Sequence, residues 1–212
     1  MERVTASNWQ PDERWSPRMF LGAGGVLAGY TTLKGLAAFT GTAYPAVEDI
    51  VGPVGFVLGF VGLLGLYSTL VERSPTLTRA AAVFTGLGAA GFSVISVSNV
   101  AEFAGLVPDG QPPLFPLLLG MAAAGVVVGY LSFGVASLRT DVYPRPLGLF
   151  LPLPALIFGA MAVGGATGAA TAIGALLISS GQALAHLSIG VTLRRGIPAG
   201  EQDVQPADVT PG

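Results

Sequence analysis

The chain contains no cysteine, a single histidine, a single lysine and few charged residues of either sign. Only 10% of its 212 residues are charged, whereas soluble domains carry about 25%. So little charge excludes a soluble globular enzyme and a nucleic-acid-binding protein, because neither could cover its surface with this composition. The lack of cysteine excludes a disulfide scaffold, thiol catalysis and cysteine-ligated iron–sulfur clusters.

The single histidine, His186, excludes several cofactor sites. Haem held by two histidines would need a second one, and a zinc site needs three or four ligands close together. A retinal protein would need a lysine deep in its last helix, but the only lysine, Lys34, lies in the first apolar run. We therefore predict no cofactor, no bound metal and no catalytic site, and we do not expect an enzyme.

What the chain has instead is long apolar runs. Each holds about 20 mostly uncharged residues, the length of an α-helix that crosses a bilayer core of about 30 Å. Six runs fit this description: 19–39, 52–71, 79–103, 114–138, 147–164 and 169–193. They are apolar all round rather than alternating, which favours helices over a β-barrel. The predicted fold is all-α, a polytopic transmembrane bundle of six helices in the cell membrane. The last two runs could instead form one re-entrant pair, because no charge separates them.

The cations predict the orientation of this bundle, because Lys and Arg gather in the cytoplasmic connections of membrane proteins. Nine of the ten cations precede the first run, follow the last run or lie in the second and fourth connections: Arg3, Arg14, Arg18, Arg73, Arg79, Arg139, Arg145, Arg194 and Arg195. The other three connections contain no cation, and the first of them carries Glu48 and Asp49. Both termini are therefore predicted to be cytoplasmic.

The chain divides into one membrane domain with two flanking segments. Residues 1–18 are predicted to form a cytoplasmic N-terminal segment, and 19–195 the six-helix membrane domain. Residues 196–212 contain three prolines and three acidic residues without a cation. Such a stretch has too little apolar surface to fold, so we predict a disordered acidic cytoplasmic tail.

The two halves of the membrane domain share a weak pattern. A Gly-Tyr pair is followed at nearly the same spacing by a Tyr-Pro pair in each half: Gly29-Tyr30 with Tyr44-Pro45, and Gly129-Tyr130 with Tyr143-Pro144. Three spans separate the copies, so the pattern is consistent with a 3+3 inverted repeat, as in many secondary transporters. The alternative is chance, because glycine and tyrosine are common in membrane helices and at their interfaces.

Ionisable and polar residues within the apolar runs are candidate functional groups, because they are costly in lipid unless they are paired. Lys34 lies in the outer half of the first run and could extend outward to Glu102, Glu48 or Asp49. On the third run, Ser96 and Asn99 share one helix face, with Glu102 beside them. These residues predict either a substrate or ion site open to the outside, or a structural ion pair.

A second polar group lies on the last run, where Ser179, Gln182 and His186 share one helix face. His186 could relay protons, or it could simply be hydrogen-bonded to a neighbour. In the fifth run, Pro152 and Pro154 predict a kink. A broken helix beside a polar face is typical of transporter binding sites, although a kink can also serve packing alone.

Glycines four residues apart give three helices a smooth face: Gly25 with Gly29, Gly55 with Gly59, and Gly125 with Gly129. Such faces let helix backbones approach closely in a membrane. They predict either packing within the bundle, or contact with a second copy or a membrane-protein partner. The lipid bilayer is the other expected partner, and no nucleic acid is expected.

The connection after the fourth run, residues 139–148, has the sequence RTDVYPRPLG. Here an arginine ends one apolar run and a Pro-Arg-x-x-Gly element opens the next, which resembles a turn of uncharacterised multi-pass proteins of bacteria and archaea. Nine arginines to one lysine and the acidic tail resemble membrane proteins of halophilic archaea. The resemblance implies a six-helix integral membrane protein and carries no activity and no functional residues.

Two interpretations of function follow. The first is a structural or accessory membrane component, in which the polar groups of the membrane domain are paired and closed off from water. The alternative is a small secondary carrier for an ion or small solute. It predicts a water-accessible cavity bounded by spans one, three, five and six, together with two superposable halves.

Overall fold

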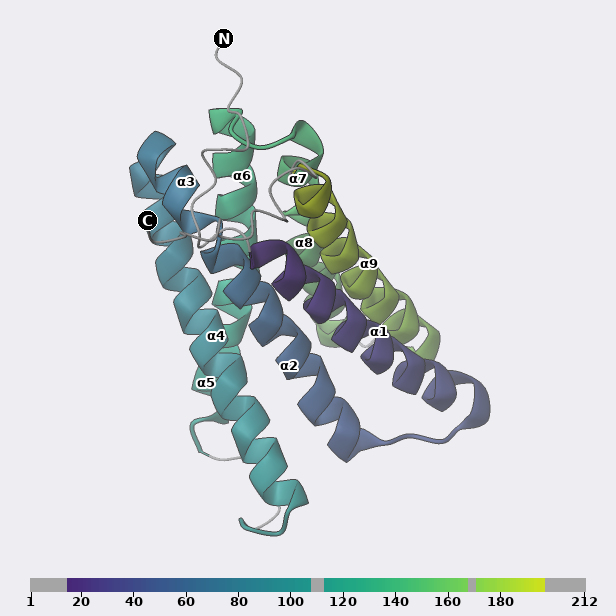
Figure 1. The fold of residues 1–212 in the computed structure, drawn as a ribbon. Coiled ribbons are helices and arrows are strands. Elements are labelled where there is room, and N and C mark those ends of the chain that lie inside the picture. Colours follow the sequence, from purple (N-terminus) through teal and green to yellow (C-terminus); the bar gives the residue numbers. More distant parts are fainter. Residues whose placement is uncertain (1–14, 108–112, 168–170, 197–212) are drawn as a thin grey trace, which may run out of the picture.

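The structure, a computed structural model, describes residues 15–107, 113–167 and 171–196, and within these ranges it contains helices but no strand. The predictions for residues 1–14 and 197–212, which cover most of the N-terminal segment and the acidic tail, lie outside the described residues. The elements in chain order are α1 (Ser16–Thr40), α2 (Pro45–Leu64), α3 (Tyr67–Arg73), α4 (Pro75–Phe103), α5 (Phe115–Ala124), the π-helix η3 (Gly125–Gly129), α6 (Tyr130–Thr140), α7 (Arg145–Phe150), α8 (Leu153–Ala166) and α9 (Ala172–Gly196) (Figure 1).

Five helical rods in the described part of the chain are long and apolar enough to cross a membrane: Pro45–Leu64, Pro75–Phe103, Phe115–Thr140, Arg145–Ala166 and Ala172–Arg195. The all-helical, membrane-compatible fold is therefore confirmed. The helix α1 is 25 residues long, but it is not among these five, and it contains Lys34, Tyr30 and three threonines. The six-span count thus stays a prediction that depends on α1.

The second predicted run, 52–71, is displaced from the observed helices. The helix α2 begins at Pro45, which has the fixed φ suited to a first helical turn. Glu48 thereby falls in the first turn of α2, where the positive end of the helix dipole stabilises a carboxylate. At the other end, α2 stops at Leu64 and the chain bends before α3. The predicted run therefore combined parts of two helices.

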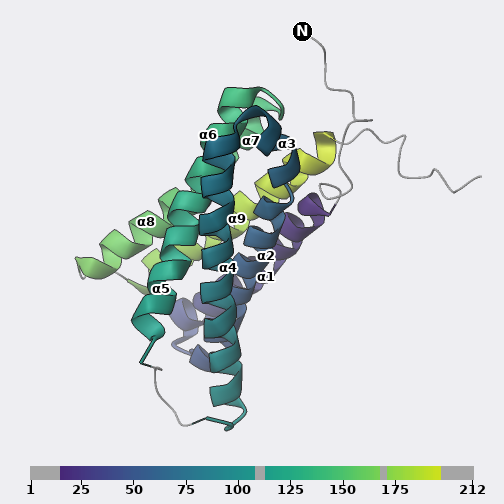
Figure 2. The same ribbon diagram turned by 90° about the vertical axis from the view of Figure 1, so that its left-hand side faces the viewer.

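The rods pack as a ring. Each of the five apolar rods contacts the next one along the chain, and α1 contacts both α2 and α9, which closes the ring (Figures 1 and 2). In the view of Figure 2, α8 runs obliquely to the upright α4. The described arginines all lie near helix ends at one end of this ring: Arg18, Arg73, Arg79, Arg139, Arg145, Arg194 and Arg195. The turn between α1 and α2 lies at the opposite end.

Glycines allow the closest contacts between the rods. A Cβ atom on Gly125 would collide with the Cα atom of Gly88 on α4, and one on Gly59 would collide with side chains described below. Two of the three predicted glycine faces therefore pack inside the bundle. The third has no atom within 4 Å of a Cβ placed on Gly25 or Gly29, so a partner on that face stays a prediction.

Candidate functional site

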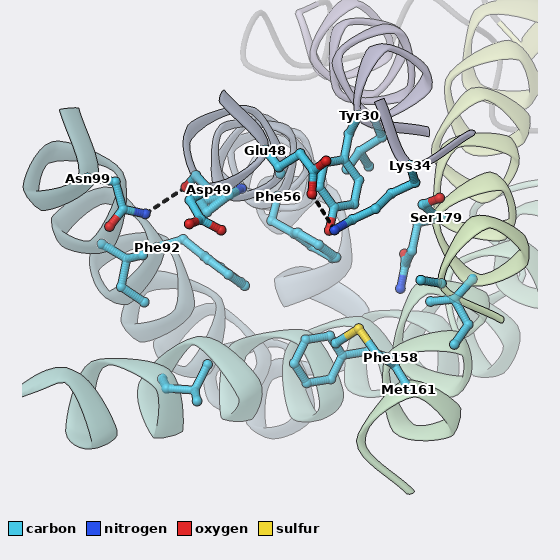
Figure 3. Close-up of a pocket in the computed structure, with 18 of the residues that line it drawn as sticks. Tyr30, Lys34, Glu48, Asp49, Phe56, Phe92, Asn99, Phe158, Met161 and Ser179 are labelled. Atoms are coloured by element: carbon cyan, nitrogen blue, oxygen red, sulfur yellow. Dashed lines mark hydrogen bonds and ion pairs between the residues drawn. The ribbon is translucent and has the colours of Figure 1, made fainter. Parts of the chain in front are cut away.

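A cavity of about 690 Å³ lies at the end of the bundle that is opposite the arginines. Side chains of α1, α2, α4, α5, α8 and α9 line it, and Figure 3 shows several of them converging on a common space. Five of the seven predicted polar residues are among the lining residues: Lys34, Asn99, Glu102, Ser179 and Gln182. Spans far apart in the sequence therefore contribute polar groups to one place.

Lys34 forms an ion pair with Glu48, at 2.5 Å between Nζ and Oε2. Of the three predicted partners, Glu48 in the first turn of α2 is therefore the one that pairs with Lys34. The Lys34 ammonium also lies 5.2 Å from the centre of the Tyr30 ring, a cation–π contact on the same helix face. Glu48 is only 8% exposed, whereas Lys34 is 25% exposed, so the pair lies at the boundary between the cavity and the packed bundle.

Asn99 connects α4 to the beginning of α2. Its side-chain Nδ2 donates a hydrogen bond of 2.7 Å to the backbone carbonyl oxygen of Asp49 (Figure 3). Asp49 also lines the cavity and has an exposed side chain, and Glu102 lines it from the end of α4. Sequence reasoning placed Glu48 and Asp49 in a connection and omitted them from the candidate site. The proline before them was the signal that the helix starts earlier.

Gln182 occupies the deeper part of the site. Its Nε2 donates a hydrogen bond of 2.8 Å to the carbonyl oxygen of Pro154, and its Oε1 is buried without a hydrogen-bond partner among the described residues. The neighbouring Ser179 instead bonds within its own helix, to the carbonyl oxygen of Leu176. The predicted polar face of the last span therefore points inward.

The helix is interrupted at Leu151 and Pro152, between α7 and α8, but both residues keep helical backbone angles. The kink at Pro152 and Pro154 therefore stays a prediction. Prolines at positions 152 and 154 lack the N–H groups that would bond to the carbonyl oxygens of Gly148 and Phe150, one helical turn earlier. The carbonyl that meets a polar side chain is instead that of Pro154 itself, which accepts from Gln182. The broken helix and the polar face of α9 are thus in direct contact.

Aromatic rings form the apolar wall of the cavity. Phe56 stacks on Phe92, with ring centres 5.0 Å apart, and meets Phe158 edge-on at 6.2 Å. These rings come from α2, α4 and α8, so the wall joins three rods. The cavity therefore combines charged groups, near the ends of α1, α2 and α4, with an apolar wall of phenylalanines.

His186 lies outside this cavity, fully buried one helical turn beyond Gln182. Its Nδ1 lies 2.8 Å from the backbone carbonyl oxygen of Gln182, and its Nε2 lies 2.8 Å from the Tyr130 hydroxyl. A carbonyl oxygen only accepts, so in the neutral imidazole Nδ1 donates to it and Nε2 accepts from Tyr130. Phe20 and Phe56 pack beside the ring. This arrangement matches the structural interpretation of His186, and the proton relay stays untested.

Ser96 is the other predicted residue that does not line the cavity. It is 8% exposed, and its hydroxyl has no hydrogen-bond partner among the described residues. It is buried on α4, and it does not line the cavity with Asn99, with which helical spacing placed it on one face.

We predict that Tyr130→Phe destabilises the bundle by about 1–3 kcal/mol, because Nε2 of His186 would remain buried without a donor. The measurement is thermal unfolding of the purified protein in detergent. Tyr44→Phe, at a 45% exposed position, is the matched control and should leave the melting temperature unchanged. Equal melting temperatures for both variants would contradict the role of this hydrogen bond.

No protein-family model, curated protein or solved structure matches this chain. The resemblance to membrane proteins of halophilic archaea therefore stays a prediction. Among the residues that the structure describes, no group of three or more histidine, cysteine or acidic side chains could hold a metal ion.

Proposed function

We propose that the protein is a small secondary carrier of the cell membrane, with six spans and both termini in the cytoplasm, which binds a solute in the cavity between its helices. The observation that carries the proposal is the cavity of about 690 Å³, lined by polar groups from α1, α2, α4 and α9. Binding sites for small molecules commonly have volumes of about 300–1,000 Å³. The direct contact of a broken helix with the polar face of α9 also supports it.

The orientation follows from the arginines at the opposite end of the ring, which would lie in the cytoplasm. The cavity would then open to the outside. The 3+3 inverted repeat is part of the proposal: α1 packs on α9 and the rod Phe115–Thr140 packs on α4, and such a repeat would make these two contacts equivalent. The helix breaks do not follow this symmetry, because one lies after the end of α2 and the other near the start of the rod Arg145–Ala166.

A structural or accessory role is the second candidate, and two observations favour it. Lys34 is paired with Glu48, and His186 is sealed inside the bundle, as this interpretation predicted. A partner would then use the open face at Gly25 and Gly29. This role does not account for the cavity, which a purely structural bundle would fill with side chains.

The test uses the absence of cysteine, so that an introduced cysteine is the single thiol of this chain that can be labelled. Ile178 lines the cavity from α9, and its neighbour Leu177 is 67% exposed on the outer surface of the bundle. We expect Ile178→Cys to react in intact cells with a membrane-impermeant methanethiosulfonate reagent. Leu177→Cys is the matched control and should not react, because a thiol facing lipid does not ionise.

The outcome also tests the orientation. If Ile178→Cys reacts only in permeabilised cells, the cavity faces the cytoplasm and the proposed orientation is wrong. If it reacts under neither condition, the cavity is closed to water, the carrier proposal fails and the accessory role stands.

A further inference from the structure

The charges around the cavity are unbalanced. Three carboxylates line it, those of Glu48, Asp49 and Glu102, against the single ammonium of Lys34. That ammonium is already bound, to Glu48 Oε2 on one side and to the face of Tyr30 on the other. The cavity therefore attracts cations and repels anions, and the low dielectric of the surrounding helices strengthens both effects.

Two buried oxygen atoms in the lining also lack a hydrogen-bond donor among the described residues. They are Oε1 of Glu48 and Oε1 of Gln182, and both residues are buried. Buried polar atoms in folded proteins are nearly always hydrogen-bonded. Both oxygens are buried within the lining, so a ligand in the cavity would supply the missing donors after a small movement of these side chains. Both atoms only accept, so a matching ligand must carry N–H or O–H groups.

The rest of the lining is apolar and aromatic. Phe56, Phe92 and Phe158 form the wall, and Met161 lies beside Phe158 (Figure 3). A hydrated inorganic cation would gain little from such a wall. An organic cation gains both apolar burial and contact of its charge with ring faces.

We infer that the cavity binds a protonated amine with an apolar body, the ammonium at Glu48 and Gln182 and the body against the phenylalanines. The inference rests on the proposed function and specifies its substrate class. An organic anion paired with Lys34 is the competing ligand, and it would have to displace Glu48 from the ammonium while it faces two further carboxylates.

Four probes with the same phenyl body separate the contribution of the positive charge from that of the hydrogen-bond donors. They are 2-phenylethylammonium, its N-trimethyl derivative, 2-phenylethanol and phenylacetate. Binding is measured by calorimetry on the full chain in lipid nanodiscs. We expect saturable binding of 2-phenylethylammonium, and binding weaker by about tenfold for the trimethyl derivative, which has the charge but no N–H donor. Phenylacetate should not bind. Phenylacetate binding as tightly as the ammonium, or no binding of the ammonium, would overturn the inference.

Variants locate the site. Glu48→Gln should weaken the binding of 2-phenylethylammonium by about tenfold or more, because it removes the carboxylate and releases the Lys34 ammonium into the cavity. Asp49→Asn changes an exposed position with little influence on folding. It should weaken the binding of this probe by about threefold. Glu72→Gln, an exposed acid of α3 outside the cavity lining, is the matched control and should bind normally. Equal affinities for all three variants would overturn the inference even if the ammonium binds.

Failure of this inference is distinguishable from failure of the carrier proposal. If the anionic or neutral probe binds and protects Ile178→Cys from the thiol reagent, the cavity is a solute site and only the assignment of an amine is wrong. If Ile178→Cys is unreactive from both sides of the membrane, the proposed function itself fails.

Discussion

Gly125→Ala is expected to destabilise the bundle by about 3 kcal/mol or more, although it adds only one methyl group. The new Cβ atom would collide with the Cα atom of Gly88 and lie 2.9 Å from both the Gly88 nitrogen and the Phe84 carbonyl oxygen. Overpacked cores usually lose about 1–3 kcal/mol, because flexible side chains move aside. Here all three neighbours are backbone atoms of α4, so the two rods must separate. Thermal unfolding in detergent measures the loss.

Gly120→Ala is the matched control, because it makes the same substitution in the same rod. No atom lies within 4 Å of a Cβ placed there. Alanine is favoured over glycine in a helix by up to about 1 kcal/mol, so this variant should be as stable as the parent or slightly more stable. The two substitutions are thus expected to change the free energy of unfolding in opposite directions. Equal destabilisation at both positions would show that α4 and η3 are not in backbone contact.

Glu48→Ala is expected to cost about 2 kcal/mol, because it leaves the Lys34 ammonium without its carboxylate. Removing one partner of a fully buried ion pair costs about 3–5 kcal/mol, and the smaller figure reflects the 25% exposure of Lys34, which retains some water. Lys34→Met should be destabilising as well, since it leaves both oxygens of a buried carboxylate without a partner.

The double variant, Lys34→Met with Glu48→Ala, separates a true pair from two independent effects. Replacing both charges of a buried pair is often close to neutral, so we expect its melting temperature to approach that of the parent. A double-mutant cycle in detergent gives the coupling free energy. Additive losses would mean that Lys34 and Glu48 do not interact in the folded protein.

Much of the fold follows from local properties of the sequence. The apolar runs predicted the helical rods, and the positions of the arginines between these runs predicted that they share one end of the bundle. Both signals can be seen in short stretches of the sequence, without knowledge of contacts between distant residues. The inward orientation of Ser179, Gln182 and His186 also followed, because helical spacing fixes which residues share a face.

The rest depends on contacts between distant segments. Glu48 and Asp49 were left out of the second predicted run because they are charged. In the structure Glu48 lies in the first turn of α2, where it pairs with Lys34. Helical spacing placed His186 and Gln182 on one face of the last run. In the structure Gln182 lines the cavity, whereas His186 packs against Phe20, Phe56 and Tyr130 outside it. The Tyr130 partner had no local signal, because it lies 56 residues from His186.

The π-helix η3 changes which residues share a face along the rod Phe115–Thr140. A turn with i→i+5 hydrogen bonds contains one residue more than an α-turn, and each residue of an α-helix corresponds to about 100° of rotation. Everything after Gly129 is therefore rotated by about that angle relative to an uninterrupted helix. A single helical wheel drawn over Phe115–Thr140 assigns the wrong faces to α5 or to α6. Tyr130 is the first residue after η3 and its hydroxyl contacts His186, so we expect deletion of one residue from η3 to turn that hydroxyl away from His186.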